Sequence, residues 1–599
     1  MTEPLGPTGP VESDPLPEPM SGLEPTTEAV PTTVVEVQPL ISAANARIGS
    51  PRRRRLRWAI AAVATAVVVV GTTLGFAVLS SARSSSQVLP WAPGDAILYT
   101  EVRADMPGDQ RANLLAFLSK FPGFADQTSF DVKADDGLDR LVKKLTDNKH
   151  DFSTEIKPWF GGQLGISVEG ADINAPGVLL VASVRDTAGA AAWLKAIAPT
   201  DATHLTVGGV DLTEVGGSSP KTAGAWGLDG SILLAGTVDA VKAAITRGPS
   251  GDLAGNAGFK AAASALNGDD LASMYVDMKS YFKLVTDAEA QMLSQLGNEG
   301  GGMTMPSMAP LDTSLLPGWV AMRVRAESDH LVFDEALQTV AGQSAQAGHT
   351  STIAAELPAS TVAQYELHDV GSQVKNVIGQ IEGQPGAPTA AQVDAALKYV
   401  GGLDKAVGWL GDADIVVLHD SAGFSGGVVA QTTDAAASTD LIAELKNLAS
   451  LAGSQVGVTL RTESYDGQTI TIVGADLSAA GMGTSGRLDL AFTQTKDLVI
   501  AGVGDGFVKA VLDTKAGSSL ADQPAYQRAI GLTGASNAGQ GFVDLTAVRT
   551  AIEALAAGSD GMKAYASDVK PFLEPIQSIA WSTTMGTDVS TGRFVLVLK

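Results

Sequence analysis

WAIAAVATAVVVVGTTLGFAVL, residues Trp58 to Leu79, contains no charged residue and decides how the rest of the chain is organised. At about 1.5 Å of rise per residue, a helix of this length spans the ~30 Å hydrocarbon core of a bilayer. Inside lipid no water can satisfy the backbone amides and carbonyls, so a single apolar run can cross only as a helix. The sequence therefore predicts one transmembrane helix between a short tail and a large body.

The charges beside this run predict its orientation. Five arginines precede it: Arg52, Arg53, Arg54, Arg55 and Arg57. Because basic residues next to a spanning helix stay in the cytoplasm, we expect residues 1–57 inside, and the linker 80–88 and the body outside. Ser80-Ser81-Ala82 would suit a cleaved secretory signal, but signal peptides have a shorter apolar core near the chain start. The sequence favours an uncleaved, single-pass signal anchor in the cell membrane.

The body is expected to be acidic and extracellular. The chain of 599 residues has a net charge of −24 and no cysteine, so its core alone must stabilise it outside the cell. An acidic surface repels phosphate backbones, which argues against nucleic acid as a partner. The predicted partners are the bilayer, through one helix, and another protein or ligand of the cell envelope.

The tail before the arginines is expected to be disordered. Its first fifty residues are rich in Pro, Glu, Thr and Ser and contain no aromatic residue, so they cannot bury enough apolar surface to fold. Four threonines among acidic residues are candidate phosphorylation sites: Thr26, Thr27, Thr32 and Thr33. An inert, solvated leader is the favoured interpretation, because the signal is compositional.

The body contains a sequence unit that occurs twice. MYVDMKSYFKLV (residues 274–285) recurs as GFVDLTAVRTAI (541–552), and PGDAILYTEV (93–102) corresponds to PASTVAQYEL (358–367). Further blocks recur in the same order, which indicates a tandem duplication. We place repeat 1 at residues 89–340 and repeat 2 at residues 353–599.

Each repeat alternates strand and helix patterns. We expect a strand at 95–103, a helix that begins at Asp105, a buried strand at 178–184 and a helix at 186–198. Hairpins are expected around Gly208-Gly209 and Asp229-Gly230. These elements predict an α+β fold with a mainly antiparallel sheet that helices cover on one face.

LPWAPGDAILYTEVRADMPGDQRANLLAFLSKFPGF (residues 89–124) follows the predicted anchor and its arginine-rich flank. This arrangement resembles an actinobacterial family of single-pass membrane proteins of unknown function, the domain-of-unknown-function family thirty-three fifty-two. The resemblance covers most of residues 55–599, and its most specific part runs from Tyr99 to Asp105 and from Pro107 to Gln110. It implies an architecture and a location, but no activity and no site residues.

Motifs for chemistry are scarce. No G-x-S-x-G run for a nucleophilic serine occurs. Six histidines lie far apart in the sequence and are expected to be ordinary surface or strand residues: His150, His204, His330, His349, His368 and His419. No catalytic residue and no cofactor are predicted.

Two clusters remain open. Glu101, Arg103 and Asp105 share one strand face beside Asp109, where an exposed row of ion pairs is favoured over a ligand site. In residues 297–317, Met303, Met305 and Met308 could hold Cu(I), or they could form an apolar loop that contacts a partner.

The sequence favours a non-enzymatic binding or scaffolding component of the cell envelope, with contacts in a groove between the repeats or on the 297–317 loop. The alternatives are an envelope hydrolase that uses carboxylates, or a carrier of a lipid or other hydrophobic ligand.

Overall fold

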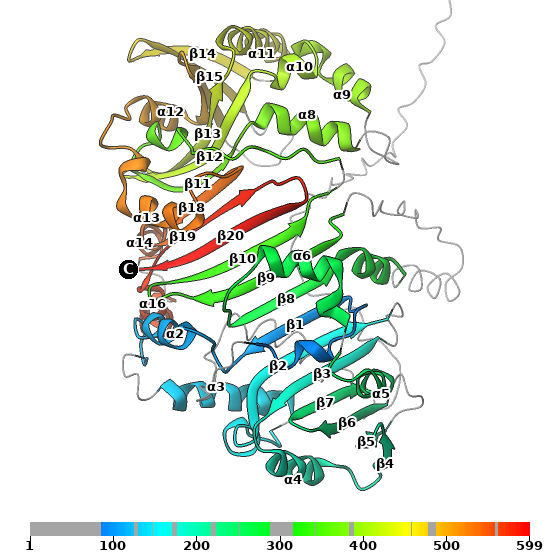
Figure 1. Ribbon diagram of the computed structural model, residues 1–599. Helices are drawn as coiled ribbons and strands as arrows, with labels where there is room; N and C mark the ends of the chain where they lie inside the picture. The colour runs from blue at the N-terminus through cyan, green and yellow to red at the C-terminus, as the bar shows by residue number, and fades with distance from the viewer. Residues whose placement is uncertain are drawn as a thin grey trace, which may run out of the picture. The chain divides into compact units, whose positions relative to one another are not determined.

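A computed structural model (Figure 1) describes residues 85–124, 130–146, 148–170, 176–216, 223–250, 252–287, 316–340, 342–381, 389–456, 458–476, 487–557 and 561–599. In this part of the chain no helix is both long and apolar enough to span a bilayer. The predicted membrane helix, Trp58 to Leu79, lies outside the described residues. So do the arginines at 52–57, the tail threonines and the three methionines Met303, Met305 and Met308.

The strands of the first half are β1 (Leu98–Arg103), β2 (Phe160–Glu169), β3 (Gly177–Val184), β4 (Thr203–Val207), β5 (Val210–Val215), β6 (Gly224–Asp229), β7 (Ile232–Thr237), β8 (Ala272–Asp277), β9 (Trp319–Ala326) and β10 (His330–Gln338). Its longer helices are α2 (Gln110–Leu118), α3 (Phe130–Leu145), α4 (Thr187–Ile197), α5 (Val238–Arg247) and α6 (Ala257–Ala265).

The strands of the second half are β11 (Thr361–Leu367), β12 (Leu410–Asp420), β13 (Gly423–Thr432), β14 (Val458–Tyr465), β15 (Gln468–Asp476), β16 (Arg487–Gln494), β17 (Leu498–Val503), β18 (Gly539–Asp544), β19 (Ile576–Thr584) and β20 (Val589–Leu598). Its helices include α8 (Val370–Ile381), α9 (Ala390–Ala396), α10 (Leu403–Val407), α11 (Ala435–Val456), α12 (Asp505–Leu512), α13 (Pro524–Thr533), α14 (Leu545–Leu555) and α16 (Lys570–Leu573).

The two halves have the same strand order. The first runs β4-β5-β6-β7-β3-β2-β1-β8-β9-β10, with each neighbouring pair antiparallel. The second runs β14-β15-β16-β17-β13-β12-β11-β18-β19-β20, again antiparallel throughout. Nine residue pairs between β10 and β20 join the halves into one sheet. The predicted α+β class with a mainly antiparallel sheet is confirmed.

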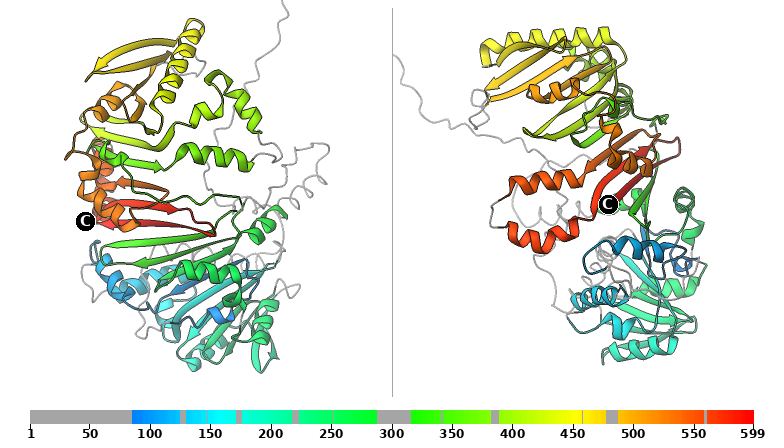
Figure 2. Two further views of the ribbon diagram at one scale, coloured as in Figure 1. Left: turned by 45° about the horizontal axis from the view of Figure 1, so that its top comes forward. Right: turned by 90° about the vertical axis from the view of Figure 1, so that its left-hand side faces the viewer.

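Helices cover both faces of the sheet, so the expectation of a single covered face is wrong. On β3, Leu179 and Val181 pack in one apolar cluster with α5, whereas Leu180 and Ala182 belong to a cluster on the opposite face. Because side chains alternate along a strand, the two sets must point in opposite directions. Figure 2 shows helices on both sides of the strands.

Local turn chemistry follows the sequence in most places. Gly208 and Gly209 have φ of 55° and 86°, as the two-residue β4–β5 turn requires. The helix expected at Asp105 instead begins at Gln110. Met106 has φ of 45°, which interrupts a helix, and the carboxylate of Asp105 accepts hydrogen bonds from Arg103 and Gln163 instead of capping.

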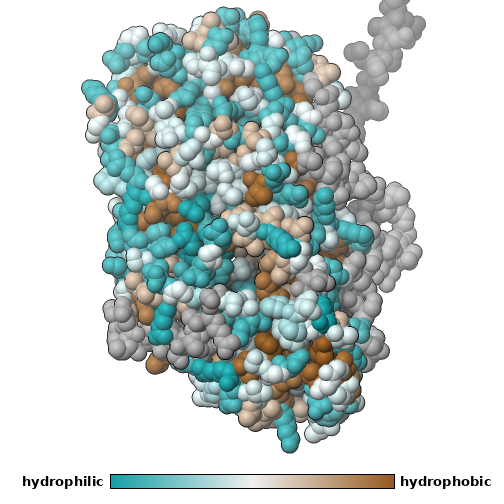
Figure 3. All heavy atoms as spheres, in the orientation of Figure 1, coloured by the Kyte–Doolittle hydropathy of each residue, from teal (hydrophilic) through white to brown (hydrophobic). Residues whose placement is uncertain are grey.

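Hydrophilic side chains cover much of the face in Figure 3, with apolar patches between them.

Candidate metal centre

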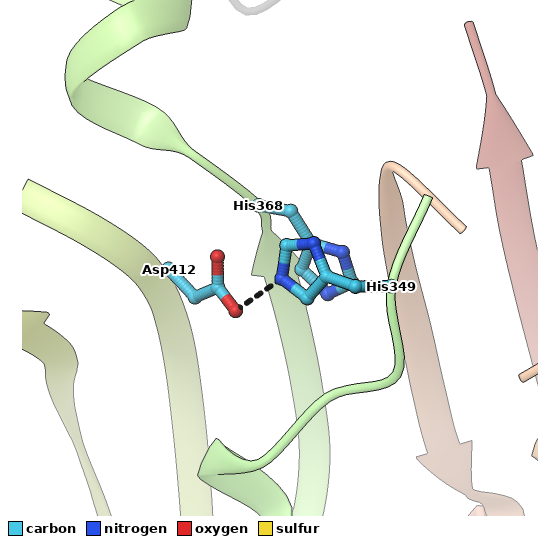
Figure 4. Close-up of side chains that lie close together, drawn as sticks. All are labelled: His349, His368 and Asp412. Atoms are coloured by element: carbon cyan, nitrogen blue, oxygen red, sulfur yellow. Dashed lines mark hydrogen bonds and ion pairs between the residues drawn. The ribbon is translucent and has the colours of Figure 1, made fainter. Parts of the chain in front are cut away.

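Three side chains that are distant in sequence meet beside the start of β12. His349 lies in the extended segment before β11, His368 directly follows β11, and Asp412 lies on β12 (Figure 4). One ligand atom from each residue lies within 4.8 Å of the other two. The rings of His349 and His368 are stacked, with centroids 4.1 Å apart.

Backbone pairing with Asn537 positions both histidines. His349 forms an isolated antiparallel bridge with Asn537, with both N–H···O distances at 3.1 Å. The same Asn537 carbonyl oxygen lies 2.8 Å from Nδ1 of His368. Because a carbonyl only accepts, Nδ1 of His368 must carry a proton. Such a contact orients the ring and leaves Nε2 as the nitrogen that can bind a metal.

Nε2 of His368 has no hydrogen-bond partner of normal geometry, although the residue is completely buried. Its nearest charged neighbour is Oε1 of Glu366, at 3.4 Å. Burial alone would lower the pKa of His368, but the hydrogen-bonding and charge of Glu366 outweigh this effect and raise the pKa. The negative charge of Glu366 therefore favours a positive charge at Nε2 of His368, carried either by a proton or by a metal ion.

The third ligand, Asp412, is held at both oxygens. The backbone N–H of Asp369 donates to Oδ1 at 3.0 Å, and Nε2 of His349 lies 2.7 Å from Oδ2. Asp369 has φ of 50°, which turns its amide toward the carboxylate at the end of β11. Asp412 is buried, whereas 40% of the His349 side chain is exposed. The group is thus open to solvent on the His349 side.

Two imidazoles and one carboxylate form a donor set typical of Zn²⁺ and other first-row transition metals. The six histidines were expected to lie apart as surface or strand residues, but His349 and His368 stack against each other and His368 is completely buried. Spacing along the chain could not show this, because the two rings meet through a β-bridge rather than on one helix. The repeated block at 93–102 and 358–367 ends one residue before His368, so the recurrence of blocks gave no signal for this site.

Beneath the histidines lies a second, fully buried polar layer. Glu366 on β11 stands opposite Asp414 on β12 and opposite Gln540 on β18. Nε2 of Gln540 donates to Oε2 of Glu366 at 3.1 Å. Burial, followed by the charge of Glu366, raises the pKa of Asp414 well above its usual range. A backbone contact with Tyr365 opposes this rise by favouring the charged form of Asp414.

The first half carries a different set at the equivalent positions. Arg103 donates to both oxygens of Asp105, at 2.8 and 3.0 Å, and the hydroxyl of Tyr99 donates to Glu101 at 2.8 Å. Glu101, Arg103 and Asp105 share a face as expected, but each is at most 6% exposed. The predicted exposed ion-pair row is therefore wrong, because this face of β1 is covered: Tyr99, on the same face, packs against Phe259 of α6. Asp109 alone of this cluster is exposed.

The other four histidines are not part of this group. His150 contacts Glu155, His330 contacts Asp329, and His419 packs against Phe424. His204 lies near Thr213 on the next strand. In the described ranges, His349, His368 and Asp412 form the one group of three potential metal ligands.

Comparison with known proteins adds a family but no activity. The model of one family, described as "Protein of unknown function (DUF3352)", matches residues 62–599. This match corrects the resemblance drawn from the sequence. It begins at residue 62 rather than 55, and its description includes neither an actinobacterial source nor a single-pass anchor.

Two solved structures, crystal forms I and III of TP0453, are 9% identical in sequence and cover 44% of this chain. They are matched over 82% and 84% of their own length, with TM-scores of 0.23 and 0.22. Likeness at this level supports no argument. No curated protein matches the sequence.

Proposed function

Because this chain belongs to DUF3352, a family of unknown function, we propose a function from its own site: a non-enzymatic protein that binds a divalent transition-metal ion through His349, His368 and Asp412. The observation that carries the proposal is the convergence of three potential ligand atoms within 4.8 Å around a buried imidazole whose Nε2 has no hydrogen-bond partner. Zn²⁺ is the ion that this donor set suits best.

The surroundings support a bound ion. Zn–N and Zn–O bonds are about 2.0–2.2 Å long, so ligand atoms around one tetrahedral ion stand roughly 3.3 Å apart. Rotation of the exposed His349 ring away from its 2.7 Å contact with Asp412 would open that space. Contacts of Asn537 and Asp369 with the ligands are the second-layer hydrogen bonds that orient metal ligands in other proteins. Water would complete the coordination from the solvent side.

The binding site would be displayed outside the cell. The uncharged run Trp58–Leu79 and the arginines 52–57 support a single-pass anchor, a cytoplasmic tail 1–57 and an extracytoplasmic body. The shared strand order supports a tandem duplication with repeats at 89–340 and 353–599. Protease added to intact cells should remove the body and spare the tail; trimming of the tail alone would refute this topology.

Zinc binding is tested with the full chain in detergent, by competition against a chromophoric chelator. Wild type should bind one Zn²⁺ per chain, and His349→Ala should weaken binding at least 100-fold. His204→Ala is the matched control, because His204 is an exposed strand histidine with no carboxylate contact. Equal zinc affinity in wild type and His349→Ala, with unchanged thermal unfolding, would overturn the proposal.

A further inference from the structure

We propose that a second cation, of the oxygen-preferring class of Mg²⁺, Ca²⁺ and Mn²⁺, binds between Glu366, Asp414 and Gln364 on the buried face of β11 and β12. This inference rests on the proposed metal-binding function and extends it, because the two ions together would form a two-cation centre. The second ion would be bound by a different set of atoms.

The first observation is a buried pair of carboxyl groups that face each other. Glu366 and Asp414 are register partners across two adjacent antiparallel strands, and each is 0% exposed. Side chains directly opposite on such strands have Cβ atoms about 4.5–5.5 Å apart. Neither oxygen of Asp414 has a hydrogen-bond donor of normal geometry. Glu366 accepts from Gln540 at one oxygen, and its other oxygen lies 3.4 Å from Nε2 of His368. Among the residues that the structure describes, no lysine or arginine pairs with either carboxylate.

The second observation is a buried side-chain amide without hydrogen-bond partners, that of Gln364. Gln364 lies two residues before Glu366, so both side chains project from the same face of β11. Gln364 is 2% exposed, yet both its Oε1 and its Nε2 have no hydrogen-bond partner. A buried amide without partners is destabilising, so such groups are normally hydrogen-bonded. Its oxygen can supply a neutral ligand beside the two carboxylates.

The third observation comes from the equivalent place in the first half. There Glu101, which corresponds to Glu366, faces Gly165, where the second half has Asp414. Tyr99, at the position of Gln364, donates its hydroxyl to Glu101, and the guanidinium of Arg103 lies 3.9 Å from the same carboxylate. In the first half, Glu101 thus has a hydroxyl donor and a guanidinium beside it and faces a glycine across the strand pair. In the second half, Glu366 accepts from Gln540 and lies 3.4 Å from Nε2 of His368, but it faces a second buried carboxyl group, Asp414.

Electrostatics favours an added cation at this place. Two carboxylates taken out of water cost several kcal/mol each, unless positive charge or hydrogen bonds compensate them. Carboxylate and amide oxygens are the ligands that Mg²⁺, Ca²⁺ and Mn²⁺ prefer, whereas the imidazoles of the neighbouring group suit zinc. The two positions therefore differ in chemistry and can be loaded separately.

The test uses Mn²⁺ as the probe on the full chain already loaded with one Zn²⁺. Electron paramagnetic resonance of free Mn²⁺ should show one bound Mn²⁺ per chain. Asp414→Asn should weaken Mn²⁺ binding at least 30-fold while it changes zinc affinity by less than about fivefold. Glu101→Gln is the matched control in the first half and should leave Mn²⁺ binding unchanged.

Asp414→Asn removes a buried carboxyl group that lacks a hydrogen-bond partner of normal geometry, so the metal-free variant should unfold at the same or a higher temperature than wild type. Wild type, but not this variant, should gain thermal stability on addition of Mn²⁺. Absence of Mn²⁺ binding to zinc-loaded wild type, or equal binding by Asp414→Asn, would overturn the second position and leave the zinc proposal intact. Loss of zinc binding alone, with Mn²⁺ binding retained, would overturn the zinc proposal instead.

Discussion

The imidazole rings of His349 and His368 are stacked at 4.1 Å, with their planes inclined by 20°. One carbonyl oxygen, that of Asn537, accepts from the backbone N–H of His349 and from Nδ1 of His368. A loop residue and a strand-end residue are thereby brought to one place next to Asp412. The pairing depends on β18 lying beside β11, because Asn537 lies two residues before the start of β18.

Asp412→Asn should lower zinc affinity at least 100-fold, because the variant keeps the shape of the side chain but removes the charged ligand. The amide oxygen can still accept from the N–H of Asp369, so the fold should be retained. Chelator competition measures the affinity. Asp420→Asn, at the exposed end of the same strand, is the control and should bind zinc as wild type does.

Asp270→Asn should stabilise the protein at pH 8 and have little effect at pH 4. Burial, followed by the charge of Glu101, raises the pKa of Asp270 to about 7. The folded state thus holds a proton that the unfolded state releases near pH 4, so unfolding becomes easier as pH rises from about 4 to 7. The expected gain at pH 8 is roughly 1–3 kcal/mol, measured by denaturant unfolding. An equal gain at both pH values would contradict this account.

Asp334→Asn should destabilise the fold by about 3–5 kcal/mol, because it leaves the buried Arg323 without its paired carboxylate. Asp334 on β10 contacts Arg593 at 2.6 Å, Arg323 at 2.9 Å and Arg325 at 3.4 Å, and so links β9, β10 and β20. Burial alone would raise its pKa, but Arg593 and Arg323 lower it. The contribution is therefore complete above about pH 4 and is lost as pH falls through the lowered pKa. The control Asp329→Asn, at a 45% exposed side chain, should cost less than about 1 kcal/mol.

Gly502→Ala should be strongly destabilising, whereas Gly506→Ala should be neutral or stabilising. A Cβ at Gly502 would lie 2.6 Å from the ring of Phe507, which is completely buried under β13 and β17. At Gly506, inside α12, a Cβ would meet nothing within 4 Å, and alanine favours a helix by about 1 kcal/mol over glycine. Thermal unfolding of the two variants compares them directly. A similar loss of stability in both variants would show that the contact with Phe507 is not the reason why Gly502→Ala is destabilising.

Much of the secondary structure could be predicted from local pattern. The strand at 178–184, the helix after Asp186 and the hairpin at Gly208-Gly209 all appear close to their expected bounds. Asp186 caps α4 by accepting from the N–H of Gly189, which is a contact between neighbours in sequence. Prediction failed at Asp105, where a tertiary contact with Arg103 and Gln163 replaced the local cap. Burial of Glu101 and Arg103 was missed for the same reason, since strand alternation shows which residues share a face but not what covers that face.

By itself, the sequence determined the class of fold, the order of the elements and the recurrence of blocks in the two halves. The class and order of the elements depend on residues within one helix turn, one strand or one hairpin. There the spacing along the chain decides which side chains share a face. Only the tertiary structure decided that β10 and β20 join the halves and that His349, His368 and Asp412 meet. It also decided that Glu366 and Asp414 face each other in a fully buried layer. Each of these relationships needs strands that are distant in sequence to lie side by side, and only the completed sheet brings them together.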